Sequence, residues 1–136
     1  MAHFVELENG NLLNTSCITL LYPRVGIKYD SEKIKVHAAI RVEWTDEVGE
    51  LISVTAVAPW TDLDNEVESY ELMCAERKRL EKSIRDLLLE VVRGLELDLK
   101  IYYPSLALRE QLQQAANDTA EKISEEVKKM EEEQNE

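Results

Sequence analysis

A stretch of twelve residues, KIKVHAAIRVEW at positions 33–44, constrains the fold more than any other part of the sequence. Its apolar residues recur at every second position, and the intervening positions are mostly charged or polar. Because successive side chains of an extended chain point to opposite sides of a sheet, this alternation predicts a half-buried β-strand. The polar side of the strand carries Lys33, Lys35, His37, Arg41 and Glu43. This side is mostly basic, and we expect acidic helix surface to cover it; the alternative is an anion-binding recess.

The other segments of residues 1–60 also have strand patterns. Asn9-Gly10 lies between two short β-prone runs, which predicts a hairpin. A third strand follows in CITLLY and is expected to stop at Pro23. Residues 33–44 and 51–58 are expected to pair as a long antiparallel hairpin. Residues 1–60 are therefore predicted to be mainly β.

The hydrophobic period changes at residue 61, where apolar residues begin to recur at three and four. Residues 61–94 are predicted to form a helix with Gly94 as its C-cap. Residues 95–103 alternate again and are predicted to return to the sheet as a strand. Residues 105–136 are predicted to form a second helix with a frayed acidic end.

This order of elements predicts a single α+β domain over residues 1–136. It has an N-terminal antiparallel sheet of about five strands plus the returning strand, followed by two C-terminal helices. The expected core residues are Val36, Ile40, Val42, Trp44, Val54, Leu80, Ile84, Leu87 and Leu99.

The charge balance limits the classes of partner. The chain has 28 acidic and 16 basic residues and a formal net charge of −12. This excess argues against direct nucleic-acid binding by the whole surface and against docking to an anionic membrane. The sequence also has no apolar run long enough to span a membrane and no signal-peptide pattern at residue 1, so a cytoplasmic location is expected.

Motifs of catalysis and metal binding are absent from the sequence. It contains no GxSxG, P-loop, GxGxxG or HExxH pattern. The histidines His3 and His37 and the cysteines Cys17 and Cys74 do not have zinc-site spacing. We therefore expect no catalytic residue, no metal and no cofactor, and two buried, reduced thiols.

The basic residues are concentrated in two segments. One group lies on the first helix and the other on the strand at 33–44. Nearby acids make an ordinary solvated surface one interpretation of both groups. If the two groups converge in space, they would form a site for a phosphate-bearing ligand. The candidate anion-binding residues are Arg77, Lys78, Arg79, Lys82, Arg85, Lys33, Lys35 and Arg41.

The last helix has a narrow apolar seam that continues past any obvious partner in the chain. A helix that packs on a sheet usually has a wider stripe. The seam could pack on the first helix of the same chain or on a second copy, and both alternatives stay open. A homo-oligomer, most simply a two-fold dimer, is expected from the second alternative. The candidate self-association residues are Leu112, Ala116, Thr119, Ile123, Val127 and Met130.

These features predict an acidic, non-catalytic interaction protein that self-associates through its helices. Small size, acidity and absent catalytic motifs are typical of accessory proteins of phages or mobile elements, so inhibition of a host factor is one hypothesis. The first alternative is a binder of a small anionic, nucleotide-like ligand through Arg and Lys residues. The second is a DNA mimic, whose carboxylates would replace phosphates on a basic partner.

Overall fold

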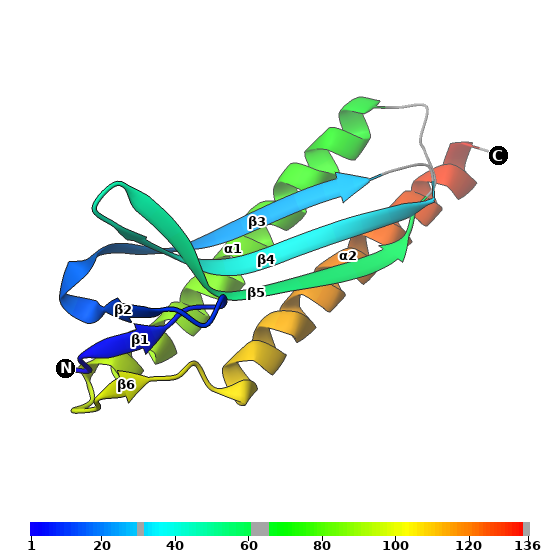
Figure 1. Ribbon diagram of the computed structural model, residues 1–136. Helices are drawn as coiled ribbons and strands as arrows, with labels where there is room; N and C mark the ends of the chain where they lie inside the picture. The colour runs from blue at the N-terminus through cyan, green and yellow to red at the C-terminus, as the bar shows by residue number, and fades with distance from the viewer. Residues whose placement is uncertain (30–31, 61–65, 135–136) are drawn as a thin grey trace.

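The computed structural model describes residues 1–29, 32–60 and 66–134 and has an α+β fold, as predicted (Figure 1). A three-stranded antiparallel sheet, a small mixed sheet and two long helices make up the chain. The elements in order are β1 (Phe4–Glu6), β2 (Leu12–Asn14), a 3-10 turn (Thr15–Cys17), β3 (Ile18–Tyr29), β4 (Lys33–Trp44), β5 (Glu47–Pro59), α1 (Glu66–Glu96), β6 (Ile101–Tyr102) and α2 (Leu106–Gln134).

The larger sheet has the strand order β3-β4-β5, and β4 covers the same residues 33–44 that the alternation predicts. The predicted hairpin partner is β5, which begins at Glu47 rather than at 51. The hairpin turns at Thr45 and Asp46, both of which have positive φ. A two-residue turn of this kind needs positive φ at both central positions, and it closes the hairpin directly. The strand pair is therefore longer than the sequence pattern indicates.

We expected the third strand to stop at Pro23, but β3 runs through this residue to Tyr29. β3 is an edge strand of the larger sheet. Proline is tolerated on an edge strand where its nitrogen faces away from the neighbouring strand. Arg24 and Lys28 consequently belong to the sheet, in register with Ala39 and Lys35 of β4.

The two helices lie side by side under one face of the larger sheet (Figure 1). α1 packs mainly under β3, and α2 packs under β4 and β5. The β4 residues that face the helices are buried, with Ile34, Val36 and Ile40 completely inaccessible to solvent. This arrangement gives the sheet one covered, apolar face and one face without a helix, as is common for antiparallel sheets.

The segment after α1 differs from its predicted form. α1 continues past Gly94 to Glu96, and only Ile101–Tyr102 of the predicted strand 95–103 forms a strand, β6. β6 pairs in parallel with β1 rather than with the larger sheet. The Asn9-Gly10 hairpin joins β1 and β2 as predicted, with a φ of 87° at Gly10. The small sheet is thus β2-β1-β6.

The boundaries of the helices follow from local contacts. Helix α2 begins at Leu106, where the Oγ of Ser105 accepts a hydrogen bond of 3.1 Å from the backbone N–H of Leu108. Ser105 is thus a helix N-cap. The predicted start of the first helix at residue 61 and the predicted frayed end at residues 135–136 lie outside the described residues.

Most of the predicted core is buried. Val36, Ile40, Val42, Val54, Leu80 and Ile84 are all buried, and Trp44 and Leu87 are half-buried. Leu99 is 39% exposed, so its predicted place in the core is wrong. It lies between α1 and β6 rather than in a strand. Cys17 is exposed and Cys74 is half-buried, and both are free thiols; burial of Cys17 was therefore also a wrong prediction.

Candidate functional site: the open face of the sheet

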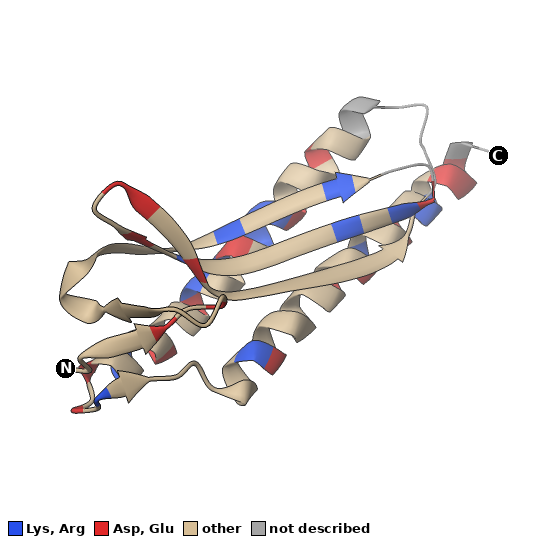
Figure 2. Cartoon of the chain, in the orientation of Figure 1, with Lys and Arg blue, Asp and Glu red and all other residues tan. Residues whose placement is uncertain are grey.

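The face of the larger sheet that the helices leave uncovered is rich in basic residues. β4 contributes Lys33, Lys35, His37 and Arg41, because these positions alternate with its buried residues. β3 contributes Arg24 and Lys28 through its register with β4. We call the surface formed by Arg24, Lys28, Lys33, Lys35, His37 and Arg41 the basic face; Figure 2 shows its Lys and Arg residues along β3 and β4. The expectation that acidic helix surface covers this face is wrong, since both helices pack on the apolar side.

One end of the basic face holds a cluster of lysines. Lys28 and Lys35 are directly opposite each other on adjacent strands. Together with Lys33 and Tyr29 they line a hollow of about 140 Å³. Within the described part of the chain, neither Lys28 nor Lys35 has an ion-pair partner, and Arg24 has none either. Like charges directly opposite in a sheet are destabilising, so an anion seated here would relieve their repulsion.

The middle of the basic face is already neutralised by the chain. Arg41 Nη2 and His37 Nε2 each lie 3.7 Å from Glu50 Oε1. His37 also contacts two hydroxyl groups of β5, with Nε2 3.3 Å from Ser53 Oγ and Nδ1 3.4 Å from Thr55 Oγ1. The uncompensated charge of the basic face is therefore concentrated at Lys28, Lys35 and Arg24.

The cations of α1 lie apart from the basic face. Arg77 pairs with Glu81 of the same helix at 3.9 Å, and Arg79 Nη1 lies 3.1 Å from Glu76 Oε1. The remaining members of this group, Lys78, Lys82 and Arg85, are exposed. Because α1 packs on the apolar side of the sheet, the structure does not bring this group together with Lys33, Lys35 and Arg41.

A buried carboxylate joins the two helices. Glu76 is only 3% exposed, and its Oε1 lies 3.1 Å from Arg79 Nη1 and 3.3 Å from Lys122 Nζ of α2. Burial raises the pKa of Glu76 above its ordinary value; nearby Arg79 lowers it and Glu126 raises it further. Glu76 was not among the predicted site residues, although it precedes Leu80 and Ile84 at intervals of four on the apolar stripe.

We expect the free energy of unfolding to fall as the pH rises through the window just above 4.5, partly because of Glu76. A carboxyl group with a folded-state pKa above its unfolded value of 4.5 keeps its proton longer in the folded protein, so ionisation favours unfolding there. Glu76→Gln should flatten this part of the profile. Urea unfolding at several pH values between 4.5 and about 7 measures it.

Glu81→Gln, at a half-buried glutamate of the same helix that pairs with Arg77, is the matched control for this prediction, and it should keep the slope of the parent protein. An identical pH profile for Glu76→Gln and the parent protein would contradict the assignment.

The predicted self-association seam is used within the chain. Leu112, Ala116, Ile123 and Val127 are at most 1% exposed, and Thr119 is 8% exposed. Met130, at the end of the seam, is half-buried. The expectation that the seam continues past any packing partner in the same chain is wrong, because α2 packs against β4, β5 and α1 together. Self-association through this seam therefore loses its basis.

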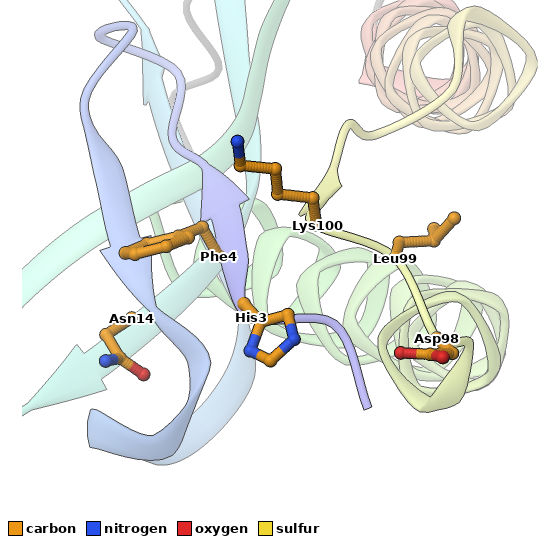
Figure 3. Close-up of a pocket in the computed structure, with 6 residues that line it drawn as sticks. All are labelled: His3, Phe4, Asn14, Asp98, Leu99 and Lys100. Atoms are coloured by element: carbon orange, nitrogen blue, oxygen red, sulfur yellow. The ribbon is translucent and has the colours of Figure 1, made fainter.

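Another hollow lies between the β1–β2 hairpin and residues 98–100. It measures about 460 Å³, and its lining includes His3, Phe4 and Leu99. Figure 3 shows that its two charged residues, Asp98 and Lys100, extend away from each other. The hollow thus has no converging charges that would select an anion or a cation.

Two further features of the described residues bear on function. They contain no group of three His, Cys, Asp or Glu side chains that could hold a metal ion. Neither helix has, over its described residues, a stretch that is both long and apolar enough to cross a bilayer.

Comparisons with protein-family models, curated proteins and solved structures give no match to this chain.

Arg24 and Lys28 of the basic face were not among the predicted anion-binding residues. The third strand was expected to end at Pro23, so its alternation was not followed through residues 24–28. The alternation was nevertheless available, since Arg24, Gly26 and Lys28 interleave with Val25 and Ile27.

Proposed function

We propose that this chain is a non-catalytic binding protein that binds an acidic partner through its basic face. The observation that carries the proposal is the opposed pair Lys28 and Lys35, which borders a hollow and has no counter-ion among the described residues. A carboxylate or phosphate group placed between the two ammonium groups would make charge-assisted hydrogen bonds with both. The partner would supply the negative charge that the described residues do not place there.

The net charge of −12 does not oppose such binding at close range. At physiological ionic strength the Debye length is about 8 Å, so exposed charges farther away are largely screened. The helix layer that carries most of the acids lies on the other side of the sheet. The local charge of Lys28, Lys35 and Arg24 therefore dominates the interaction.

An acidic polypeptide fits the basic face better than a nucleic acid does. The uncompensated cations occupy a short part of the face, and Glu50 and Glu43 follow along the strands. A regular polyanion that crosses the whole face would meet these acids. A short run of carboxylates can end before it reaches them.

A labelled deca-glutamate peptide tests this proposal by fluorescence anisotropy. Lys28→Glu/Lys35→Glu should weaken binding by about tenfold or more, because hydrogen bonds to charged groups contribute about 1.5–3 kcal/mol each. Affinity for the parent protein should also fall as salt rises.

The matched control, Lys78→Glu/Lys82→Glu, changes the same number of charges on α1 and should stay within about twofold of the parent affinity. Equal loss in both variants, or no binding to the parent protein, would contradict the proposal. Tighter binding of a single-stranded oligonucleotide of equal charge would overturn the polypeptide assignment.

Inhibition of a host factor stays within this proposal if the factor presents an acidic segment. The DNA-mimic hypothesis instead requires the exposed acids of α1 and α2. The five cations between Arg77 and Arg85 interrupt that surface, so a phosphate-like row of carboxylates is less well supported. The DNA-mimic hypothesis would be favoured if charge reversal of the helix acids changes the affinity for a partner and charge reversal of Lys28 and Lys35 does not.

A further inference from the structure

The two edges of the larger sheet differ in how their backbone groups are satisfied. On β5, the Glu50 carbonyl accepts a hydrogen bond of 2.8 Å from the backbone N–H of Glu8. The carbonyls of Ser53 and Thr55 accept bonds from two α2 side chains, Arg109 at 3.4 Å and Gln113 at 3.0 Å. Arg109 is itself held by a bidentate pair with Glu8, which raises its pKa. The β5 edge is thus closed by the chain.

The register shows which backbone groups of β3 face outward. The Ser53 carbonyl points away from β4, so Ser53 and its partner Ala39 do not bond to each other. The backbone groups of Ala39 therefore point toward β3. Arg24, which lies opposite Ala39, directs its N–H and C=O groups toward β4. Val25 and Ile27 lie one and three residues after Arg24, so their N–H and C=O groups point the opposite way, to the outer edge. Pro23 is also in this outward set, where its missing N–H removes no bond of the sheet.

The outer edge of β3 is open. Within residues 1–29, 32–60 and 66–134, no other element makes a backbone hydrogen bond to Val25 or Ile27. The edge belongs to a strand of 12 residues. The outward N–H and C=O groups of Val25 and Ile27 on this strand are a template for an added strand.

Charge specifies what kind of strand fits. On one side of an added strand, side chains would lie beside Arg24 and Lys28 of the basic face; on the other, beside half-buried Leu21 and Ile27. A segment with alternating acidic and apolar residues satisfies both sides. A second copy of β3 would instead bring another Arg24 and Lys28 to the same face.

We therefore propose that the acidic partner binds as an extended segment that adds a fourth strand to the outer edge of β3. This inference rests on the proposed function and specifies its partner as a strand with alternating acidic and apolar residues. Backbone hydrogen bonds to Val25 and Ile27 would supply affinity, and Arg24 and Lys28 would select carboxylates.

A capped peptide of four Glu-Val repeats tests this inference. In an extended strand, the N–H groups of successive residues point to opposite edges, so all valines of the peptide share one edge and all glutamates share the other. N-methylation of one set, either all valines or all glutamates, should weaken binding by about tenfold or more, and N-methylation of the other set should leave it within about twofold. The sensitive set also reports whether the added strand is antiparallel or parallel. Equal effects of both sets would overturn the proposal.

Amide hydrogen exchange gives an independent readout. The peptide should protect the N–H groups of Val25 and Ile27 and leave those of Arg24 and Gly26, already bonded within the sheet, unchanged. No added protection would overturn the inference. Protection without peptide, together with a dimer mass, would assign the edge to a second copy and overturn it as well.

The charge variant separates this inference from the proposed function. If Lys28→Glu/Lys35→Glu abolishes peptide binding while both N-methylated sets bind equally, the basic face binds acids but β3 adds no strand. If the charge variant binds as well as the parent protein, the proposed function itself fails.

Discussion

Ile40→Asp should abolish the cooperative unfolding transition of the protein. Ile40 is completely buried near the middle of the central strand β4, where no described cation lies on the covered face to pair with a carboxylate. An unpaired buried charge costs several kcal/mol or more, against a total stability of about 5–15 kcal/mol for a typical domain. Circular dichroism with thermal and chemical denaturation measures the result.

Two controls make this prediction specific to the face of β4. Lys35→Asp introduces the same group on the same strand but on the open face, so it should retain a cooperative transition. Ile40→Val should cost only about 0.5–1.5 kcal/mol. An unchanged melting temperature for Ile40→Asp would mean that β4 presents its other face to the helices.

Gly94→Ala should destabilise the protein, although alanine normally favours a helix over glycine by about 1 kcal/mol. A Cβ at position 94 would lie 2.2 Å from Tyr102 Cε2 and 2.8 Å from Cζ. Tyr102 is half-buried and packs against the hydrophobic core, so the ring must give up part of this packing to make room for the methyl group. We expect a loss of about 1–3 kcal/mol in the free energy of unfolding, measured with urea.

The double variant tests the cause of this loss. In a Tyr102→Ala background, Gly94→Ala should become neutral or stabilising, because the ring that it meets is absent. Stabilisation by Gly94→Ala in the parent protein would show that α1 and β6 are not in the close contact that the structure describes.

The central hairpin was predictable because its signal is long and regular. β4 keeps a period of two from Lys33 to Trp44, and a shift of one residue would expose every apolar side chain. β3 was only partly predictable because Pro23 is compatible with a strand only when its nitrogen faces the open edge. That condition depends on pairing with β4, which the local sequence does not contain.

The end of α1 shows a similar limit. Gly94 has the position of a C-cap in the sequence, yet it serves the close approach of Tyr102, which follows eight residues later. The alternation of residues 95–100 is regular, but those residues bond to the start of the chain through His3 and Phe4 instead of joining the larger sheet. Local periodicity cannot identify such partners.

The candidate site was predictable in part. Lys33, Lys35 and Arg41 follow from the alternation of β4, and the structure places all three on the open face. Arg24 and Lys28 required the full length of β3. The narrow seam of α2 left packing within the chain and packing on a second copy both open, and the structure shows the first. Its small residue Ala116 lets the helix approach the sheet and α1 closely. A narrow stripe is then enough to bury α2 within one chain.

Chemical-shift mapping with deca-glutamate is the most direct test of the claim that the basic face binds an acidic partner. We expect the shifts that change on titration to belong to Lys28, Lys35 and Arg24 and their neighbours on β3 and β4. The shifts of Lys78 and Lys82 of α1 should stay unchanged in the same titration. Changes confined to α1, or spread evenly over both cation groups, would contradict the claim.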